Sequence, residues 1–454
     1  MINCAMIAAV AVSLTEVGGV ADGRTLNTDA FARGMERVSS AGGGVLRVPK
    51  GVWLTGPIEF KSGVELNLAD EALVVFTSDH SKYPIVVSDL AGEKDVYAKS
   101  PLTGTGLRDV AITGRGVFDG AGDTWRPLKK AKMMEREWQK HLKRLPGFVT
   151  PDGKMWYPSE IAWKGEIEAP KLMREGVWEA GAYEKYRDFL RPKMVRFISC
   201  TNLTIRGVTF MNSPMWTINP VLCKDVHIDS VQVRNVEWGQ NTDSIDIESC
   251  EDVVVKDCEF SGGDDGICLK SGKEDVGYRI GVPCRNIHVE RCKVFHGHGG
   301  FVIGSEMSGG VSNVVVKGCT FIGTETGLRF KTARGRGGVV ENIEIKDIVM
   351  KDILHDALTM TMSYDGRSVQ ERALDPRSDG SEEIHPFNEG TPVFRDIRIE
   401  GIRCFGAKST GTMTALPESP VAGFVLKDAI FAGTGARLKL EHFKGSEVEA
   451  AYGD

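Results

Sequence analysis

The feature that most constrains the fold of this chain is a repeat that runs from about residue 195 to residue 405. Each copy contains a small or polar residue, then Asn or Asp, then two short stretches in which apolar and polar residues alternate. The copies are CTNLTIRGVTF (200–210), CKDVHIDSVQV (223–233), CEDVVVKDCEF (250–260), CRNIHVERCKV (284–294), VSNVVVKGCTF (311–321), VENIEIKDIVM (340–350) and FRDIRIEGIRC (394–404). A period of 23 to 34 residues with short, β-branched stretches predicts an all-β solenoid whose coils each carry about three strands.

Alternation with a period of two places one set of residues inside a narrow core and the other set on the surface. Cysteines follow the same phase in two sets, Cys200, Cys223, Cys250 and Cys284, and then Cys258, Cys292 and Cys319 eight residues further along the repeat. We interpret them as small, semi-apolar residues stacked coil upon coil. Disulfides or a metal site are the alternatives.

Length and charge narrow the function. The 454 residues carry a net charge of −6, which gives no support to nucleic-acid binding through bulk charge. No apolar run reaches the roughly 20 residues of a membrane span. Residues 4–14 are apolar but follow no Lys or Arg, so we predict a first strand rather than a complete secretory signal. We expect one domain over 1–454, a monomer, and a periplasmic or extracellular location.

Two segments depart from the repeat. Residues 25–44 predict a short helix that covers the N-terminal end of the solenoid, with Thr28 as N-cap and Gly42 just past its end. Residues 125–193 form an insertion with a basic, helix-prone run at 129–145 and five of the eight tryptophans of the chain. Those aromatic side chains either line a binding cleft or make the core of the insertion itself.

Aligning the strands of successive coils brings acidic residues together. The aligned apolar pairs are Ile245 and Ile247, Ile267 and Leu269, Phe301 and Ile303, and Leu328 and Phe330. In this register Asp243 and Asp265 share one position on adjacent coils, which are about 4.8 Å apart in a sheet. Asp264 lies one residue earlier, and His298 takes the matching place on the next coil.

The same face receives three cations, Lys270, Arg329 and Lys331. Carboxylates held this close repel, so at least one should have a raised pKa. A single Asp here would be an ordinary turn residue, but three in register beside a His and several cations are not explained by turns. Glycoside hydrolysis needs a protonated carboxyl group and a second carboxylate, which in inverting enzymes stands about 6.5 to 9.5 Å away. The three aspartates can supply both.

Four short motifs carry a resemblance to a known family. Asn241-Thr242-Asp243, Gly263-Asp264-Asp265, Gly297-His298-Gly299 and Arg329-Phe330-Lys331 follow in the order and spacing of the polygalacturonase family, glycoside hydrolase family 28. The segment 42–68 is also similar to the N-terminal coils of that family. Phe330 replaces the usual Ile of the last motif, but it points inward in our register. The resemblance implies a right-handed parallel β-helix.

The resemblance also implies roles for the site residues. Asp264 would be the general acid, Asp243 and Asp265 would hold and activate a water molecule, and His298 would tune the protonation of Asp264. Arg329 and Lys331 would bind the carboxylate of a galacturonate ring, with Lys270 beside them. Asn241 would donate or accept a hydrogen bond to the substrate. No cofactor and no metal is implied.

The expected reaction is inverting hydrolysis of α-1,4-galacturonide bonds in pectin. A blocking insertion favours exo action, although endo action stays open. The intact first and third motifs favour galacturonan over rhamnogalacturonan. A Ca²⁺-dependent pectate lyase is the alternative with different chemistry, since carboxylates in register can bind Ca²⁺. A carbohydrate-binding β-helix without catalysis is the alternative from another class of protein.

Overall fold

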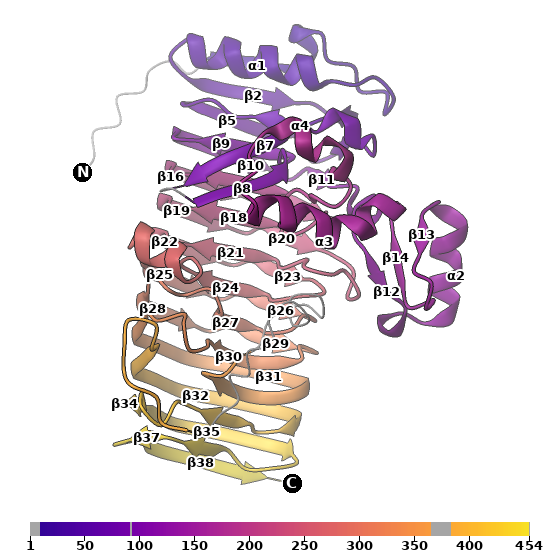
Figure 1. Ribbon diagram of the computed structural model, residues 1–454. Helices are drawn as coiled ribbons and strands as arrows, with labels where there is room; N and C mark the ends of the chain where they lie inside the picture. The colour runs from indigo at the N-terminus through magenta and orange to yellow at the C-terminus, as the bar shows by residue number, and fades with distance from the viewer. Residues whose placement is uncertain (1–9, 91–92, 365–382, 454) are drawn as a thin grey trace, which may run out of the picture.

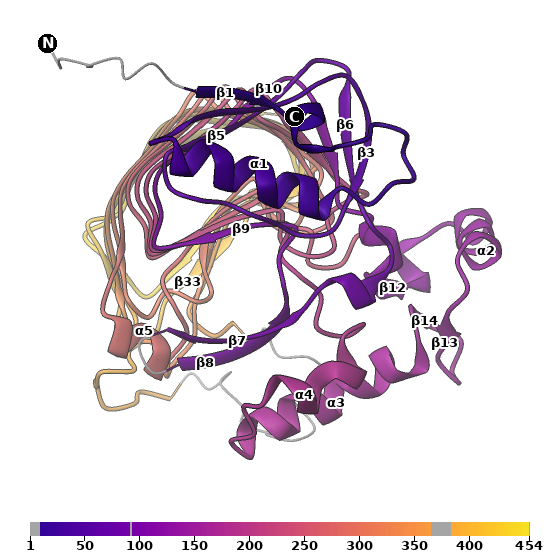
Figure 2. The same cartoon turned by 90° about the horizontal axis from the view of Figure 1, so that it is seen from above.

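The chain forms a right-handed parallel β-helix, described here from a computed structural model that covers residues 10–90, 93–364 and 383–453 (Figure 1). The predicted fold class is therefore confirmed. Each strand pairs in parallel with the equivalent strand of the next coil, so the coils stack into a prism of three sheets seen end-on in Figure 2. One helix lies across the N-terminal end of this prism, and the others lie beside it.

The first sheet contains β1 (Val10–Ser13), β2 (Gly44–Val48), β5 (Val64–Leu68), β10 (Arg108–Gly114), β16 (Thr201–Arg206), β19 (Lys224–Asp229), β22 (Glu251–Lys256), β25 (Cys284–Glu290), β28 (Val311–Lys317), β31 (Val339–Thr361), β32 (Val393–Ser409), β35 (Val425–Thr434) and β38 (Glu447–Gly453). Two short strands, β34 (Val421–Ala422) and β37 (Phe443–Lys444), extend its C-terminal end. β31 and β32 are long because they continue around the corners of their coils.

The second sheet contains β3 (Gly51–Thr55), β6 (Ala72–Phe76), β11 (Val117–Asp119), β17 (Thr209–Met211), β20 (Gln232–Arg234), β23 (Glu259–Ser261), β26 (Lys293–Phe295) and β29 (Thr320–Ile322). The third contains β4 (Ile58–Glu59), β9 (Leu102–Thr105), β15 (Val195–Ile198), β18 (Ile218–Val221), β21 (Ile245–Glu248), β24 (Ile267–Lys270), β27 (Phe301–Gly304), β30 (Thr326–Lys331), β33 (Thr412–Thr414) and β36 (Lys439–Glu441). We call this third sheet the site sheet.

The Asn or Asp at the start of each repeat has a backbone explanation. Asn202, Asp225, Asp252, Asn286 and Asn313 all have φ between 55° and 58°, in the left-handed region that Asn and Asp tolerate better than other side chains. The side chains also bond along the stack, as Asn313 Nδ2 donates to Asn286 Oδ1 at 3.2 Å. The repeat therefore encodes the bend at which each coil enters the first sheet.

The interior is a continuous apolar stack. Inward residues of the second sheet include Phe118 and Phe210, whose rings stack with centroids 5.3 Å apart. The two predicted cysteine sets are buried in this core, and all nine cysteines of the described ranges are free thiols. Stacking of small side chains is thus confirmed, and disulfides are absent from the part of the chain that the structure describes.

A helix covers the N-terminal coil, as predicted. α1 (Thr28–Ser40) packs Phe31, Met35 and Val38 against the core. Asn27 occupies the N-cap position instead of Thr28, whose Oγ1 accepts a hydrogen bond from Gly56 N at 2.7 Å. The predicted first strand is present from Val10, preceding η1 (Leu14–Val17), while its residues 4–9 lie outside the described ranges.

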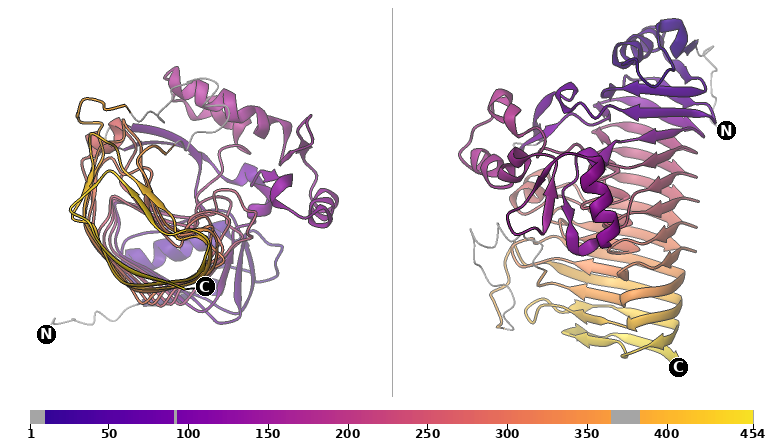
Figure 3. Two further views of the ribbon diagram at one scale, coloured as in Figure 1. Left: turned by 90° about the horizontal axis from the view of Figure 1, so that it is seen from below. Right: turned by 90° about the vertical axis from the view of Figure 1, so that its right-hand side faces the viewer.

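The insertion after β11 is a separate layer of structure that projects from one side of the solenoid (Figure 3). Its elements are η3 (Gly122–Thr124), β12 (Leu128–Lys129), η4 (Lys130–Lys132), α2 (Glu135–Arg144), β13 (Phe148–Val149), β14 (Met155–Tyr157), α3 (Glu160–Arg174), α4 (Ala180–Tyr183) and η5 (Glu184–Tyr186). Trp138 and Trp156 are buried in an apolar cluster of the insertion, and Trp125 is buried in a second cluster that the insertion shares with residues before it in the chain. These three tryptophans serve packing and do not offer a face to a ligand.

Earlier in the chain, η2 (His80–Lys82) leads into an antiparallel hairpin, β7 (Ile85–Leu90) and β8 (Glu93–Ala98), that the repeat pattern did not predict. Its apolar residues share a cluster with α3, α4 and η5, and Figure 2 shows it outside the site sheet on the side of α3 and α4. A short helix, α5 (Asp275–Ile280), lies at the other edge of that sheet. Within the described ranges, no helix is both long enough and apolar enough to cross a membrane.

Stacking in the core predicts the cost of removing one ring. Phe210→Ala leaves a cavity beside Phe118, and such changes cost about 3–5 kcal/mol. Phe405→Ala removes the same side chain from a strand position that is 50% exposed, so it should cost much less. Thermal unfolding followed by circular dichroism should show a clearly larger decrease in melting temperature for Phe210→Ala; equal decreases would contradict the stacked core.

Candidate active site

The register of the site sheet places the predicted aspartates side by side. Ile245 pairs with Ile267, and Ile267 pairs with Phe301, as the apolar alignment of the sequence required. Asp243 and Asp265 therefore occupy equivalent positions two residues before their strands, and Ser244 N donates to Asp265 O at 2.9 Å. Both side chains are almost fully buried.

Asp264 and His298 form a pair on adjacent coils. His298 N donates to Asp264 O at 2.9 Å, and the side chains meet with Nδ1 2.9 Å from Oδ1. The Asp264 side chain is 18% exposed, whereas those of Asp243 and Asp265 are 4% and 2% exposed. Asp264 is therefore the carboxyl group of the three that a ligand reaches most easily.

The cations of the last motif are already engaged by an aspartate. Lys331 Nζ lies 2.6 Å from Asp265 Oδ2, and Arg329 Nη1 lies 3.5 Å from Asp265 Oδ1. Lys331 and Lys270 lie on the predicted face of the sheet, but both are buried beneath neighbouring side chains instead of standing at the surface. Arg329 is half-buried and remains within reach of a ligand. Tyr364, which the motifs did not indicate, lies near both cations, with its ring 5.6 Å from the Arg329 guanidinium.

Lys270 is the centre of a buried charge network. Its Nζ lies 2.9 Å from Asp246 Oδ1, 3.7 Å from Glu306 Oε2 and 3.9 Å from Asp243 Oδ2. Asp246 and Glu306 were missed in the sequence, although Asp246 stands between two inward isoleucines and so faces outward beside Asp243. One ammonium group therefore balances three carboxylates below the site.

The pKa values of these groups diverge. Burial, together with the charges of Asp246 and Asp264, raises the pKa of Asp243 well above its ordinary value. Burial also raises the pKa of Asp246, to about 6, despite the nearby Lys270. For Glu306 burial is outweighed by the charges of Lys270, Arg336 and Lys331, which lower its pKa to about 2.

The Asp264–His298 pair shifts in the opposite sense. Burial raises the pKa of Asp264, but the hydrogen bond and charge of His298 outweigh it, so the pKa of Asp264 is lowered. Burial lowers the pKa of His298, but its bond to Asp264 and the charges of Asp264 and Glu325 raise it overall. Between the two pKa values the pair holds one proton, which these shifts place on His298, 2.9 Å from the Asp264 carboxylate.

The insertion supplies two further site residues that the motifs did not indicate. Arg191 donates through Nη2 to Asn241 Oδ1 at 2.9 Å and through Nη1 to Gln240 O at 3.1 Å, which fixes the amide of Asn241. Burial lowers the pKa of Arg191 to about 10. Lys132, in η4, places its Nζ 3.0 Å from His298 Nε2. Only tertiary structure brings these two residues to the site.

Asp264, Asp265 and His298 offer ligand atoms that lie within 4.8 Å of one another. Ca²⁺ takes six to eight oxygen ligands, and here Asp265 is already paired with Lys331 and Arg329. The positive charge that Ca²⁺ would supply in a lyase is therefore supplied in this site by Lys331 and Arg329. This donor set does not fit the lyase alternative.

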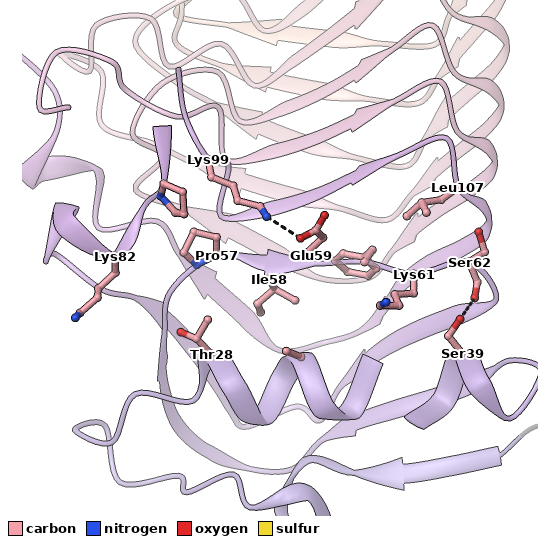
Figure 4. A pocket seen from close by; sticks show the side chains of 13 residues that line it. Thr28, Ser39, Pro57, Ile58, Glu59, Lys61, Ser62, Lys82, Lys99 and Leu107 are labelled. Carbon is pink, nitrogen blue, oxygen red and sulfur yellow. Dashed lines mark hydrogen bonds and ion pairs between the residues drawn. The ribbon is translucent and has the colours of Figure 1, made fainter. Parts of the chain in front are cut away.

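A separate pocket of about 650 Å³ lies beneath α1, between β4 and the end of η2 (Figure 4). Its three lysines each pair with a carboxylate: Lys61 with Glu36, Lys82 with Asp79, and Lys99 with Glu59. Its lining includes none of the aspartates of the site sheet. Of these two places, the aspartate cluster of the site sheet is therefore the candidate active site, and the pocket beneath α1 is not.

Comparison with known proteins decides the family. The sequence model described as "Glycosyl hydrolases family 28" matches residues 171–373. An exopolygalacturonase from Thermotoga maritima of known structure is 31% identical, with a TM-score of 0.80 over 98% of this chain and 92% of its own. The chain belongs to glycosyl hydrolases family 28. It is therefore a glycoside hydrolase.

Two further comparisons agree with this membership. The exopolygalacturonase of Yersinia enterocolitica shares the fold, with a TM-score of 0.68 at 17% identity over 96% of this chain and 78% of its own. The exo-poly-alpha-D-galacturonosidase of Dickeya chrysanthemi is 26% identical over 78% of this chain. The match spans 57% of the Dickeya protein's length.

The Lys270 network predicts a pH-dependent loss of stability. Lys270→Met leaves Asp243, Asp246 and Glu306 without their shared cation, and breaking a buried ion pair in this way costs about 3–5 kcal/mol. The pKa of Asp246 is raised to about 6, so protonation below that pH removes the unpaired charge and the deficit should shrink.

Lys224→Met is the matched control, because Lys224 also faces two carboxylates but its side chain is 57% exposed. Its effect should stay below about 1 kcal/mol. Melting temperatures measured from pH 5 to pH 8 test both variants. A Lys270→Met deficit that is no larger than the control, or that grows as the pH falls, would refute the network.

Proposed function

We propose that this glycoside hydrolase cleaves α-1,4-galacturonide linkages of pectin by single displacement with inversion. The observation that carries the proposal is the juxtaposition of three carboxyl groups, Asp243, Asp264 and Asp265, with the cations Arg329 and Lys331 beside them. The carboxyl groups supply acid and base, Arg329 recognises a uronate, and Lys331 balances the charge of Asp265. The names of the compared relatives support the same substrate class.

In this proposal Asp264 delivers the proton of the Asp264–His298 pair to the leaving glycosidic oxygen, because Asp264 is the most exposed of the three carboxyl groups. Asp243 and Asp265 hold the attacking water and accept its proton. This role is supported by Asp243 Oδ1, which is buried and has no hydrogen-bond partner among the described residues, so it can accept a hydrogen bond from the water. Asn241, held by Arg191, hydrogen-bonds the sugar. Arg329 binds the ring carboxylate, while Lys331 and Lys270 balance charge from below.

Exo action follows from what covers the site sheet toward the N-terminus. Arg196 on β15 is buried, with Asp95 Oδ2 3.8 Å from its Nη1 and the Tyr97 ring 4.2 Å from its guanidinium. Ala98 N donates to Leu190 O, which ties the hairpin to the end of the insertion. Only β18 separates this cover from the coil of Asp243, and one coil is about 4.8 Å.

A space one coil long accepts a chain end and not the middle of a polymer. The hairpin β7–β8 and the insertion therefore form the stop that defines exo cleavage in this proposal. Because pectic polymers lie outside cells, we place the enzyme in the periplasm or outside the cell, acting as a monomer.

Replacement of the acid tests the reaction. Asp264→Asn keeps the shape but cannot donate the proton, so kcat on polygalacturonate should fall by about 10²–10⁴-fold with KM little changed. Asp257→Asn is the control, since Asp257 pairs with Arg291 on the opposite surface. Reducing-sugar release and product chromatography give the readout, with monogalacturonate as the early product. Full activity of Asp264→Asn would contradict the role of Asp264 as the acid. Early release of mixed long oligomers by the wild-type enzyme would contradict exo action.

The shared proton predicts a shift in the pH profile. With the pKa of His298 raised, the Asp264–His298 pair keeps its proton toward neutral pH and loses it above. His298→Gln removes the imidazole that holds this proton, so the basic limb of the pH profile of kcat/KM should move to lower pH by about one unit or more. His288→Gln, on the exposed face of β25, is the control. A basic limb that stays in place would show that His298 does not govern the proton.

A further inference from the structure

The ladder of the catalytic aspartates continues for two more coils toward the N-terminus. Val195 pairs with Ile218, as Ile218 pairs with Ile245, so Lys193, Trp216 and Asp243 hold equivalent positions two residues before their strands. The backbones meet directly, since Met194 N donates to Trp216 O and Thr217 N donates to Asp243 O, both at 2.9 Å. Trp216 is thus the neighbour of Asp243 on the preceding coil, and Lys193 is the neighbour of Trp216 on the coil before that.

Two ammonium groups lie over the Trp216 ring, with Lys270 Nζ 3.5 Å and Lys193 Nζ 4.1 Å from its centroid. They differ in their partners. Lys270 faces three carboxylates, whereas Lys193 has no carboxylate oxygen within 4.0 Å anywhere in the described ranges. Lys193 is half-buried as a residue, and its ammonium is desolvated.

The surroundings of Lys193 make a bound anion favourable. Burial and the charge of Arg196 lower the pKa of Lys193 to about 8, and Glu248 and Asp95 only partly offset them. An ammonium without a counter-ion in such a place is costly, and a ligand carboxylate would restore its balance. Arg196, on the strand β15 that follows Lys193 in the same coil, is covered by Asp95 and Tyr97. Among the described residues, Lys193 is therefore an unpaired cation beside the cover.

We propose that Lys193 binds the carboxylate of the terminal galacturonate, with Trp216 as the wall that spaces this carboxylate from Asp243. The inference rests on the proposed exo-hydrolase function and adds to it a determinant of chain-end recognition. Arg329 lies on the other side of the aspartates along the same sheet, on β30, so the two cations would engage carboxylates of sugars on either side of the cleaved bond.

The test compares two substrates, trigalacturonate and the same trimer with the carboxyl group of its terminal sugar methyl-esterified. The wild-type enzyme should prefer the free acid. Lys193→Met should raise KM for the free acid at least tenfold, leave kcat within about twofold, and leave the ester unaffected, so that the preference disappears. Lys185→Met is the matched control, because Lys185 also lies over an aromatic ring, with Nζ 4.5 Å from the Tyr186 centroid, but in the insertion.

Lys193→Arg keeps the positive charge and should keep the preference for the free acid over the ester. This variant therefore tests recognition even if Lys193→Met is too unstable to measure. Equal losses on both substrates, or no loss on either, would overturn the role of Lys193 while the wild-type activity upholds the hydrolase. If the wild-type enzyme cleaves neither trimer, the proposed function itself fails and the inference with it.

Discussion

Parallel stacking of coils in register is the constraint on which the site depends. Hydrogen bonds between equivalent strands hold side chains from positions 20 to 35 residues apart at neighbouring steps about 4.8 Å from one another. The fold therefore builds an active centre from single residues of successive coils. Its geometry is as rigid as the sheet, because each motif side chain precedes or lies on a strand that is paired on both sides.

That rigidity forces like charges together, and the structure answers with buried cations. Lys270 serves Asp243, Asp246 and Glu306, while Lys331 and Arg329 serve Asp265. Asp264 pairs with His298 and is the most exposed of the three aspartates. The neighbouring charges thus raise the pKa of Asp243 and lower that of Asp264, although the two side chains are chemically identical.

The sequence predicted the parts of this arrangement that depend on period. Alternation and the apolar pairs gave the coil register, and the register placed Asp243, Asp265 and the Asp264–His298 pair correctly. It also led us to expect exposed cations, because strand alternation shows which face a side chain takes but not what covers that face. Lys270 and Lys331 lie on the predicted face, under neighbours from other segments.

Contacts made by non-repeating segments could not be predicted from the sequence. The hairpin β7–β8, Arg191 and Lys132 reach the site sheet through tertiary packing, which no local pattern records. The sequence left two roles open for the tryptophans of the insertion. Trp125, Trp138 and Trp156 take the packing role, and the cluster around Trp125 also includes residues of the hairpin β7–β8.

In the proposed mechanism a buried pair of aspartates delivers water to one face of the sugar while Asp264 protonates the opposite side. Proton NMR of trigalacturonate hydrolysis, recorded from the first minutes, distinguishes this mechanism from retention and from elimination. The new reducing end should appear as the β-anomer and only later equilibrate with the α-anomer. Initial appearance of the α-anomer, or of an unsaturated product, would rule the mechanism out.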